Sequence, residues 1–409
     1  MTVIRNIGYL AVCKSSGAQH ELHAIKRAAV VFEGKTISWV GEDAKIPAAF
    51  KGHDEIDVAG RLVIPGLIDC HSHLCFMGWR AEEFEKRILG KSYTEIAAAG
   101  GGILSTVRKT RLASSDQLFQ RCLDFLPRIS ELGVTTLECK SGYGLSLEHE
   151  LKTLRVYQRL AEYQPITIVP TFLGAHTVPE EYKERTEDYL RLVTDEMLPQ
   201  IVKDNLALFA DIFVEKGAFS YEQGQQVLSR AKALKLRLKI HADQLSNTRG
   251  AELAAEQGAI SADHLEHISE QGIQALKKSK TTAVLLPLAT MCTNQPPAPG
   301  RKLIEAGVRV AVATDFNPGS APSYHLPFNL TLACLLNRIT PAEAIKGATI
   351  NAAHALALDQ ICGSVEVGKM ADLAVLDAES PEQWLYHFTA NACAMTIKAG
   401  EIIHQSGTF

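Results

Sequence analysis

The sequence predicts an α/β protein built around a closed (β/α)8 barrel with a smaller β-domain attached. Short apolar segments rich in valine and isoleucine recur along the chain, as expected for buried parallel strands. Stretches with helical periodicity separate most of these segments, and such alternation over eight units closes a parallel sheet into a barrel. Both ends of the chain are instead typical of short strands and turns, which indicates the second domain.

The predicted barrel strands follow one another in chain order. They are residues 62–68, 134–138, 166–171, 208–214, 236–240, 260–264, 282–286 and 308–313. Residues 147–163 and 221–235 are amphipathic and are predicted as helices between strands. Gly100, Gly101 and Gly102 fall in the longest connection, and they predict a flexible turn because glycine disfavours a helix interior.

The chain ends are predicted to form one composite β-sandwich. Residues 28–40 are typical of a hairpin that turns at glycine, and residues 363–377 and 394–400 are further candidate strands. Neither end alone offers enough strands to be stable, so we expect the two ends to pair. The predicted domains are therefore 1–61 for the first part of the sandwich, 62–358 for the barrel and 359–409 for the second part.

Composition narrows the classes of function. The 409 residues are 46% hydrophobic and 22% charged, as in soluble globular proteins. A net charge of -4 without a basic run argues against a nucleic-acid or anionic-membrane partner. The nine cysteines form no CxxC pair, which favours reduced thiols and a cytoplasmic location. Neither a secretory signal nor a membrane-spanning apolar stretch is predicted.

The most informative motif is His71-Ser72-His73, which follows the first predicted barrel strand. Side chains two residues apart in an extended segment point the same way, so both imidazoles can hold one metal ion. His241 and Asp315 follow the fifth and eighth predicted strands, where a barrel places its chemistry. A single histidine there more often packs or hydrogen-bonds, but the combination predicts a site for one divalent metal, zinc or iron. Such an ion lowers the pKa of water toward neutrality.

Two residues are predicted to take part in catalysis. His264 ends the sixth predicted strand and should face the same barrel mouth, where an imidazole can polarise a carbonyl or stabilise its oxyanion. The alternative for His264 is to orient another ligand. Asp315 can take a proton from water and pass it to a leaving nitrogen. If Asp315 is only a ligand, another base is required.

Several motifs together carry a resemblance over essentially the full length. They are PGLIDCHSH at 65–73, GGGILSTVR at 100–108, KSGYGL at 140–145, HADQ at 241–244 and TDFNPGS at 314–320. The chain resembles the amidohydrolase superfamily, which implies a TIM-like barrel with a composite β-sandwich, a metal-dependent hydrolase activity and a homodimer. The later motifs resemble those of members that hydrolyse 4-imidazolone-5-propanoate to N-formimidoyl-L-glutamate in histidine degradation.

That resemblance implies a set of substrate contacts. They are Arg80, Tyr143, His176, Gln244, Asn317, Gly319 and Ser320. Arg80 lies seven residues after His73, and a guanidinium there can bind the propionate with two hydrogen bonds. The loop at 317–320 is expected to present backbone N–H groups to an anion. Without the resemblance, each residue is explained more simply as shaping a loop or facing solvent.

Three lysine and glutamine positions limit the mechanism. Some members of the family carry glutamate where this chain has Gln244, and an amide cannot act as a base. Gln244 is therefore assigned to substrate hydrogen bonding. Lys216 lies one or two residues too late to be the carboxylated lysine of a two-metal site, and Lys140 is also a poor candidate. One metal is expected.

Two other functions remain open from the sequence. A metal-dependent aminohydrolase, such as a purine or pyrimidine deaminase, would use the same metal and His264 but would not need Arg80. A barrel that has lost catalysis and only binds a ligand is the other alternative, although the complete ligand set argues against it.

Overall fold

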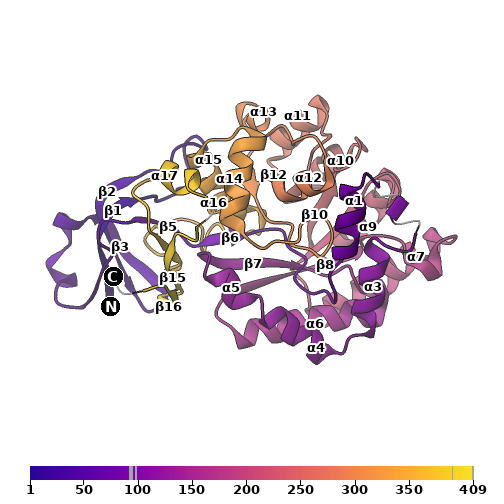
Figure 1. Ribbon diagram of the computed structural model, residues 1–409, viewed down its shortest axis with the longest axis horizontal. Coiled ribbons are helices and arrows are strands. Elements are labelled where there is room, and N and C mark those ends of the chain that lie inside the picture. The colour runs from indigo at the N-terminus through magenta and orange to yellow at the C-terminus, as the bar shows by residue number, and fades with distance from the viewer. Residues whose placement is uncertain (92–94, 97–98, 389, 408–409) are drawn as a thin grey trace.

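Strands from both ends of the chain form one sheet at one end of the molecule (Figure 1). The computed structural model describes residues 1–91, 95–96, 99–388 and 390–407. Within that part of the chain the strand order is β16-β15-β14-β5-β1-β2-β3, with β4 paired to β1. The strands are β1 Thr2–Leu10, β2 Ile25–Glu33, β3 Thr36–Glu42, β4 Asp54–Asp57, β5 Leu62–Pro65, β14 Leu373–Leu376, β15 Cys393–Lys398 and β16 Glu401–Gln405.

The composite sheet is held together by an apolar layer that draws on both ends of the chain. Ile4, Val30 and Val63 from the first part pack in one cluster with Val375 and Met395 from the last part. Val63 also pairs with Val375 in antiparallel register. Because each end supplies only part of this layer, neither end buries its apolar face alone. The predicted composite domain is confirmed.

A parallel sheet of β6 to β13, taken in chain order among the described residues, forms the barrel. Its strands are β6 Leu67–Asp69, β7 Val134–Lys140, β8 Thr167–Ala175, β9 Phe209–Val214, β10 Arg237–Ala242, β11 Ser261–His264, β12 Thr282–Leu285 and β13 Val310–Val312. The barrel is closed just beyond the first and last strands, where Asp315 N donates to His71 O at 3.0 Å and His73 N donates to Phe316 O at 2.8 Å. The predicted barrel is confirmed.

The prediction of a single first barrel strand over residues 62–68 is wrong, because this segment forms two strands in different sheets. Leu62–Pro65 is β5 of the composite sheet, where Pro65 pairs with Leu373. Leu67–Asp69 is β6 of the barrel, where Leu67 pairs with Val134. The change of sheet occurs at Gly66, where an added Cβ would lie 2.4 Å from the Thr135 side chain. The domain boundaries given above stay a prediction.

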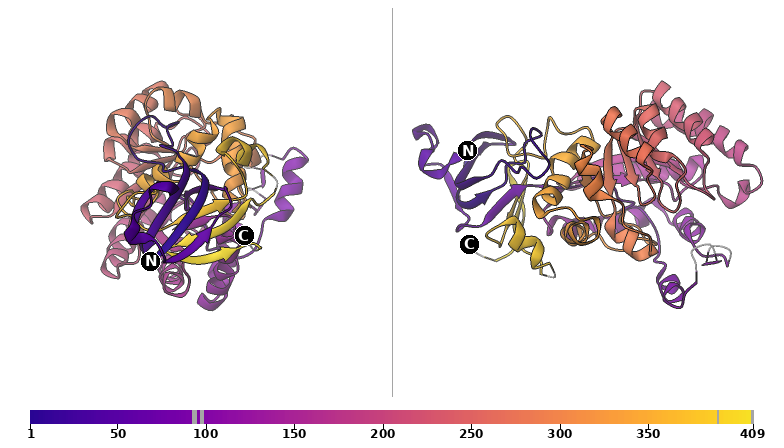
Figure 2. Two further views of the ribbon diagram at one scale, coloured as in Figure 1. Left: turned by 90° about the vertical axis from the view of Figure 1, so that its left-hand side faces the viewer. Right: turned by 90° about the horizontal axis from the view of Figure 1, so that it is seen from above.

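Helices surround the barrel and cover its strands (Figure 2). They are α1 Ala81–Ile88, α3 Ile103–Leu112, α4 Ser115–Leu123, α5 Leu126–Ser130, α6 Leu147–Tyr163, α7 Thr186–Arg191, η4 Leu192–Met197, α8 Leu198–Lys203, α9 Tyr221–Ala233, α10 Gly250–Gln257, α11 Glu270–Ser279, α12 Pro287–Thr293, α13 Gly300–Glu305, α14 Leu326–Asn337, α15 Pro341–Gly347, α16 Ile350–Ala355 and α17 Pro381–Tyr386. Short 3-10 turns are η1 Asp43–Lys45, η2 Ala48–Phe50 and η3 Glu180–Tyr182.

Local sequence explains where the two predicted helices begin. Ser146 accepts a hydrogen bond from the His149 N–H at the start of α6, and Ser220 forms a reciprocal capping box with Gln223 at the start of α9. The observed bounds of α6 match the prediction, and α9 ends two residues earlier than predicted. None of the helices in the described residues is long and apolar enough to cross a bilayer.

Tyr157 connects α6 to the barrel beneath the functional end. Its hydroxyl donates to Lys140 O at 2.8 Å and accepts from Cys75 N at 3.0 Å, and the side chain is fully buried. We expect Tyr157→Phe to lower the free energy of unfolding by about 1–3 kcal/mol, because it leaves a buried N–H and a buried carbonyl without this partner. Urea denaturation measures the loss.

Tyr163→Phe is the matched control, because Tyr163 ends the same helix and is 69% exposed. Equal unfolding midpoints for the wild type and Tyr157→Phe would contradict this role for the hydroxyl.

Candidate metal centre and substrate pocket

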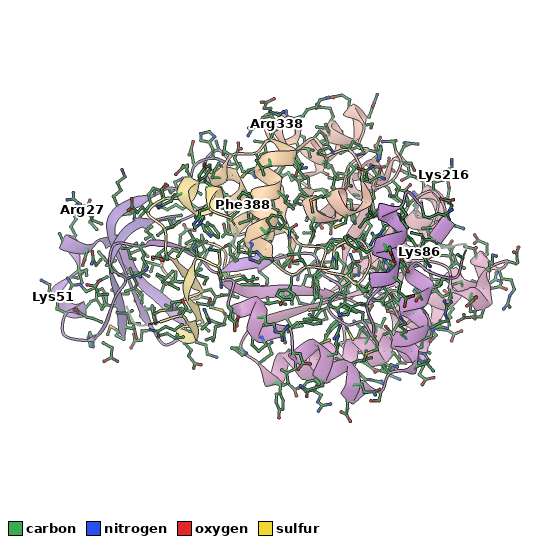
Figure 3. All side chains as sticks on the ribbon, viewed as in Figure 1. Arg27, Lys51, Lys86, Lys216, Arg338 and Phe388 are labelled. Carbon is green, nitrogen blue, oxygen red and sulfur yellow. The ribbon has the colours of Figure 1, made fainter. Side chains whose placement is uncertain are left out.

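A cavity of about 980 Å³ opens at the carboxyl ends of the barrel strands. His73, His241, His264 and Asp315 line it. Lys216 also lines it. In Figure 3 Lys216 and Lys86 lie at the end of the molecule away from Arg27 and Lys51 of the composite-sheet end. The cavity is therefore at the position where barrels of this kind carry their chemistry.

The four predicted metal ligands meet at the floor of this cavity. Asp315 Oδ1 lies 3.4 Å from His71 Nε2 and 3.4 Å from His73 Nε2. The ring centroid of His241 is 4.6 Å from that of His71 and 5.5 Å from that of His73. All four side chains are at most 3% exposed. The structure thus brings together residues from three separate strand ends.

Unpartnered nitrogen atoms show what this cluster lacks. His71 Nε2 and His241 Nε2 are buried and have no hydrogen-bond partner. Leaving such atoms unsatisfied costs about 1–3 kcal/mol each. Ligand atoms of His71, His73 and Asp315 lie within 4.8 Å of one another, close enough to share one ion. Three imidazoles and one carboxylate therefore fit a divalent metal.

Two buried carboxylates orient the histidines from below. Asp263 Oδ2 lies 2.6 Å from His71 Nδ1, and Asp211 Oδ2 lies 3.1 Å from His241 Nδ1. A carboxylate at Nδ1 leaves Nε2 free to bind a metal. Sequence analysis missed both aspartates, although a charged residue inside a predicted buried strand was a usable sign of each.

The protonation states of these groups also suit a metal. Burial, which outweighs the attraction of Asp211, lowers the pKa of His241 to about 3. Burial likewise lowers the pKa of His73. Burial would raise the pKa of Asp315, but the close imidazoles of His71 and His73 prevail and hold it well below its usual value. His73 and His241 are therefore held as neutral imidazoles beside an ionised carboxylate, the forms that bind metal. At His71 burial would lower the pKa, but the contacts with Asp263 and Asp315 outweigh it and raise the pKa.

The backbone is strained at two of the predicted catalytic positions. His264 has φ of 84° and Asp315 has φ of 54°, values that side-chain-bearing residues rarely adopt. Asp69 supports the second turn, because Thr314 Oγ1 donates to Asp69 Oδ2 at 2.5 Å. Strain of this kind costs about 1–3 kcal/mol per residue and clusters at functional sites.

His264 faces the metal ligands, as the sequence predicts. Its ring centroid lies 5.3 Å from that of His241 and 5.5 Å from that of His71. Its Nδ1 is buried without a hydrogen bond, and Glu266 Oε1 lies 3.9 Å away. The ring can therefore direct Nε2 toward a bound molecule.

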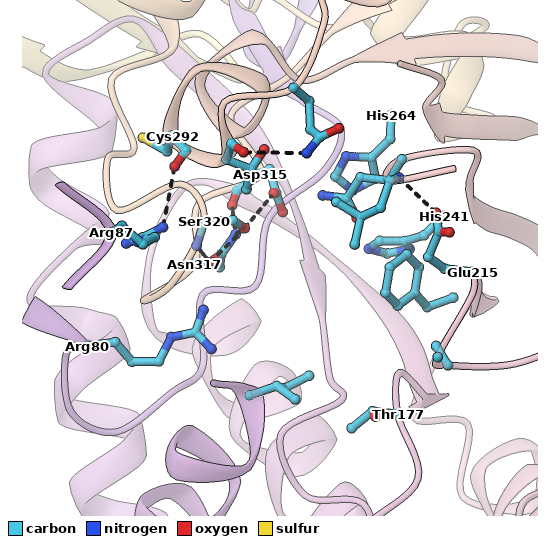
Figure 4. Close-up of a pocket in the computed structure, with 18 of the residues that line it drawn as sticks. Arg80, Arg87, Thr177, Glu215, His241, His264, Cys292, Asp315, Asn317 and Ser320 are labelled. Carbon is cyan, nitrogen blue, oxygen red and sulfur yellow. Dashed lines mark hydrogen bonds between the residues drawn. The ribbon is translucent and has the colours of Figure 1, made fainter. Parts of the chain in front are cut away.

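Arg80 lies across the cavity floor against the loop that follows β13. Its side chain is only 7% exposed, and Glu83 Oε2 is 3.7 Å from its Nε. A Cβ on Gly319 would stand 1.0 Å from Arg80 Nη2, so only glycine leaves room for the guanidinium. In Figure 4 Arg80 lies on the same side of the pocket as Asn317 and Ser320, opposite His241.

The expectation that this loop presents backbone N–H groups to an anion is wrong. Asn317 Oδ1 accepts hydrogen bonds from Gly319 N and Ser320 N, both at 2.8 Å. The amide side chain closes the loop on itself, so these donors are already used. The Ser320 hydroxyl instead lies 3.4 Å from Asp315 Oδ2.

The remaining predicted substrate contacts line the opposite wall. The ring of His176 is stacked on that of His73, with centroids 5.1 Å apart. The ring centroid of Tyr143 lies 5.8 Å from that of His73. Gln244 also lines the cavity. Glu215, which sequence analysis missed, positions the loop after Gln244 by accepting a hydrogen bond from Leu245 N at 2.8 Å. The chain segment after each strand thus supplies a group to one pocket.

Neither lysine considered for a two-metal site is placed to bridge metals. Lys216 is exposed at the cavity, two residues beyond the end of β9. Lys140 is fully buried, with its Nζ 2.7 Å from Asp211 Oδ2. It is the last residue of β7 rather than a residue after it, and it points below the histidines.

Comparisons with known proteins agree with this geometry. A model of the amidohydrolase family matches residues 62–403. The imidazolonepropionase of Symbiobacterium thermophilum is 47% identical over 92% of this chain and 89% of its own, and that of Shouchella clausii is 44% identical over 95% and 88%. A zinc-bound adenosine deaminase from Xanthomonas campestris shares the fold, with a TM-score of 0.73 at 15% identity over 98% and 92% of the two chains.

The family model covers the whole barrel and the strands β5, β14 and β15 of the composite sheet, and each of the two relatives matches more than nine-tenths of the chain. The chain therefore belongs to the amidohydrolase family, and within it to the imidazolonepropionase group. Family membership and the groups of possible ligands around His71 together indicate a divalent metal.

The buried neutral histidines predict how the metal-free protein responds to acid. Because the pKa of His241 falls from 6.5 to about 3 on folding, the unfolded chain takes up a proton that the folded chain excludes. The contribution of His241 to the free energy of unfolding is therefore fully present above about pH 6.5 and is lost as pH falls toward about 3. The loss is at most about 1.4 kcal/mol per pH unit.

Urea unfolding of metal-stripped protein from about pH 7 to about pH 4 measures this loss. We expect His241→Gln to flatten the decline, whereas His53→Gln on the exposed surface should leave it unchanged. An identical slope in His241→Gln and wild type would show that His241 does not carry the effect.

Proposed function

We propose that this chain hydrolyses the cyclic amide C–N bond of 4-imidazolone-5-propanoate to give N-formimidoyl-L-glutamate, a step of L-histidine degradation. The observation that carries the proposal is the pairing of a metal-binding histidine cluster with the buried guanidinium of Arg80 in one cavity. The substrate offers a matching pair of groups, a ring carbonyl and a propionate. Relatives named imidazolonepropionase at 41–47% identity support the same substrate.

His71, His73, His241 and Asp315 would hold the metal, which we propose to be zinc or iron because both suit three imidazoles and one carboxylate. When bound, a divalent ion polarises a carbonyl and lowers the pKa of water toward neutrality. Asp263 and Asp211 keep the rings of His71 and His241 oriented for this role.

Asp315 and His264 would carry the proton and charge transfers. The ionised Asp315 takes one proton from a water molecule while the oxygen of that water attacks the ring carbonyl carbon. His264 stabilises the negative charge that develops on the carbonyl oxygen. As the ring C–N bond breaks, Asp315 gives its proton to the leaving nitrogen. The product carries a formimidoyl group and a new carboxyl group, which becomes a carboxylate by releasing the second proton of the water to solvent.

The remaining cavity residues would bind and orient the substrate. Arg80 pairs with the propionate, because a guanidinium and a carboxylate form two parallel charged hydrogen bonds. The ring lies among the other predicted contacts, which are Tyr143, His176, Gln244, Asn317, Gly319 and Ser320. Gly319 would act indirectly, since its missing Cβ gives Arg80 its place.

The alternatives raised by the sequence are not favoured. A purine or pyrimidine deaminase does not need a cation for a propionate, and the solved deaminase resembles this chain in fold alone, at 15% identity. A barrel that only binds a ligand would not need to retain the complete ligand cluster around strained catalytic positions. We further propose a homodimer that acts in the cytoplasm, where its nine free cysteines would stay reduced.

Turnover tests the proposal directly. We expect purified protein to consume freshly generated 4-imidazolone-5-propanoate well above the spontaneous rate, seen as loss of ultraviolet absorbance. Purine and pyrimidine amines should release no ammonia. Ammonia release without loss of the imidazolone would instead support a deaminase.

Arg80 and Gly319 give a sharper test of the substrate pose. We expect Arg80→Ala to lower kcat/KM by about 100-fold, because hydrogen bonds between charged groups contribute about 1.5–3 kcal/mol. Gly319→Ala should cause a comparable loss by displacing the guanidinium, and the double variant should lose no more than Arg80→Ala alone. Additive losses would contradict the contact.

Arg155→Ala is the matched control, because Arg155 is an arginine 58% exposed in α6 that pairs with Asp204 at the surface. It should leave kcat/KM unchanged.

A further inference from the structure

Five fully buried charged side chains fill the barrel interior beneath the metal ligands. They are Glu138 and Lys140 of β7, Asp211 of β9, Lys239 of β10 and Asp263 of β11. The group holds three carboxylates and two ammonium groups with no exposed side-chain surface. Burying so many charges is expensive unless each is well paired. The proposed reaction uses none of these side chains directly, so their arrangement needs another explanation.

Lys140 is the residue that joins the two carboxylates oriented toward metal ligands. Its Nζ lies 2.7 Å from Asp211 Oδ2 and 3.6 Å from Asp263 Oδ2. Asp211 in turn contacts His241 Nδ1 at 3.1 Å, and Asp263 contacts His71 Nδ1 at 2.6 Å. One ammonium group therefore stands behind ligands that come from opposite sides of the metal cluster.

The charge of Lys140 keeps these carboxylates together in a fixed geometry. Like charges at this separation repel strongly in a low-dielectric interior. An ammonium between them offsets the repulsion, because it donates a hydrogen bond to Asp211 at 2.7 Å and lies within ion-pair distance of Asp263 at 3.6 Å. Without it, the carboxylates would turn away from one another, and the two imidazole rings would lose the partners that hold them.

We propose that Lys140 is a positioning residue for the metal centre, which holds Asp211 and Asp263 where they direct His71 Nε2 and His241 Nε2 at the ion. This inference rests on the proposed function in assuming a bound divalent metal. The test measures metal affinity instead of turnover, so the inference about Lys140 and the proposed function can fail separately.

Lys239 supplies a matched control from the same interior. It is equally buried and shares Glu138 with Lys140, at 2.7 Å, and it also donates to Cys70 O at 2.8 Å. It lies 3.7 Å from Asp263, but no ion pair within 4.0 Å joins it to Asp211 among the described residues. A general loss of buried charge would affect both lysines alike, whereas the positioning role belongs to Lys140.

The experiment is a zinc titration of metal-free protein against a competing chelator. We expect Lys140→Met to raise the Kd for zinc by about 10- to 100-fold, the usual effect of losing a group that supports a metal ligand. Lys239→Met should raise the Kd by less than about 3-fold, which is about half of the free-energy change that a tenfold difference represents. Cobalt substitution should show an altered visible spectrum only in the Lys140 variant.

A thermodynamic cycle with Asp211→Asn separates positioning from a structural role. If Lys140 acts through Asp211, the double variant Lys140→Met/Asp211→Asn should bind zinc no more weakly than the weaker of the two single variants. Additive losses, or equal losses in Lys140→Met and Lys239→Met, would overturn the proposal. Absence of zinc binding by the wild type would instead count against the proposed function.

If Lys140→Met does not fold, the double variant Lys140→Met/Glu138→Gln replaces it. This double variant removes one charge of each sign. Asp211 and Asp263 then still lack their shared cation. We again expect the Kd for zinc to rise by about 10- to 100-fold, and an unchanged Kd would overturn the proposal.

Discussion

The hydrogen bonds that close the barrel are the interaction on which the functional site depends. Asp315 N bonds to His71 O, and His73 N bonds to Phe316 O, just beyond the strands β6 and β13. Three of the four proposed metal ligands lie on these two short segments, so the contacts that close the barrel also bring these three side chains together. His241, at the end of β10, completes the set from the far side of the barrel. The cluster therefore exists only in the folded, closed chain.

Assembly of the site carries costs that the rest of the structure must offset. Histidine nitrogens are buried without partners, and His264 and Asp315 adopt left-handed backbone conformations. The charged group beneath the ligands is stabilised by its internal pairs, as at Lys140, and by hydrogen bonds to its surroundings, such as that from Lys239 to Cys70 O. A bound cation would satisfy the nitrogens, and its binding free energy would add to the free energy of folding. Metal binding and stability should thus be linked.

Much of this could be predicted from the sequence because it depends on local patterns. Apolar segments located the strands, and His71 and His73 located the site. Most of what failed depended on partners distant in sequence. A continuous apolar run at 62–68 cannot reveal that its halves join different sheets, and the pairings of Asp211 and Asp263 were hidden for the same reason. The loop at 317–320 is the exception, because Asn317 bonds to N–H groups two and three residues further on, a local turn that asparagine favours and that the sequence analysis did not use.

Zinc stoichiometry tests the central claim most directly. Metal-free wild type and His241→Ala would be titrated by calorimetry, and metal content after dialysis would be measured on both. The account predicts one tightly bound zinc per wild-type chain and loss of that site in the variant, with the fold retained by circular dichroism. Two ions per wild-type chain, no binding, or equal binding by the folded variant would contradict a single metal held by His71, His73, His241 and Asp315.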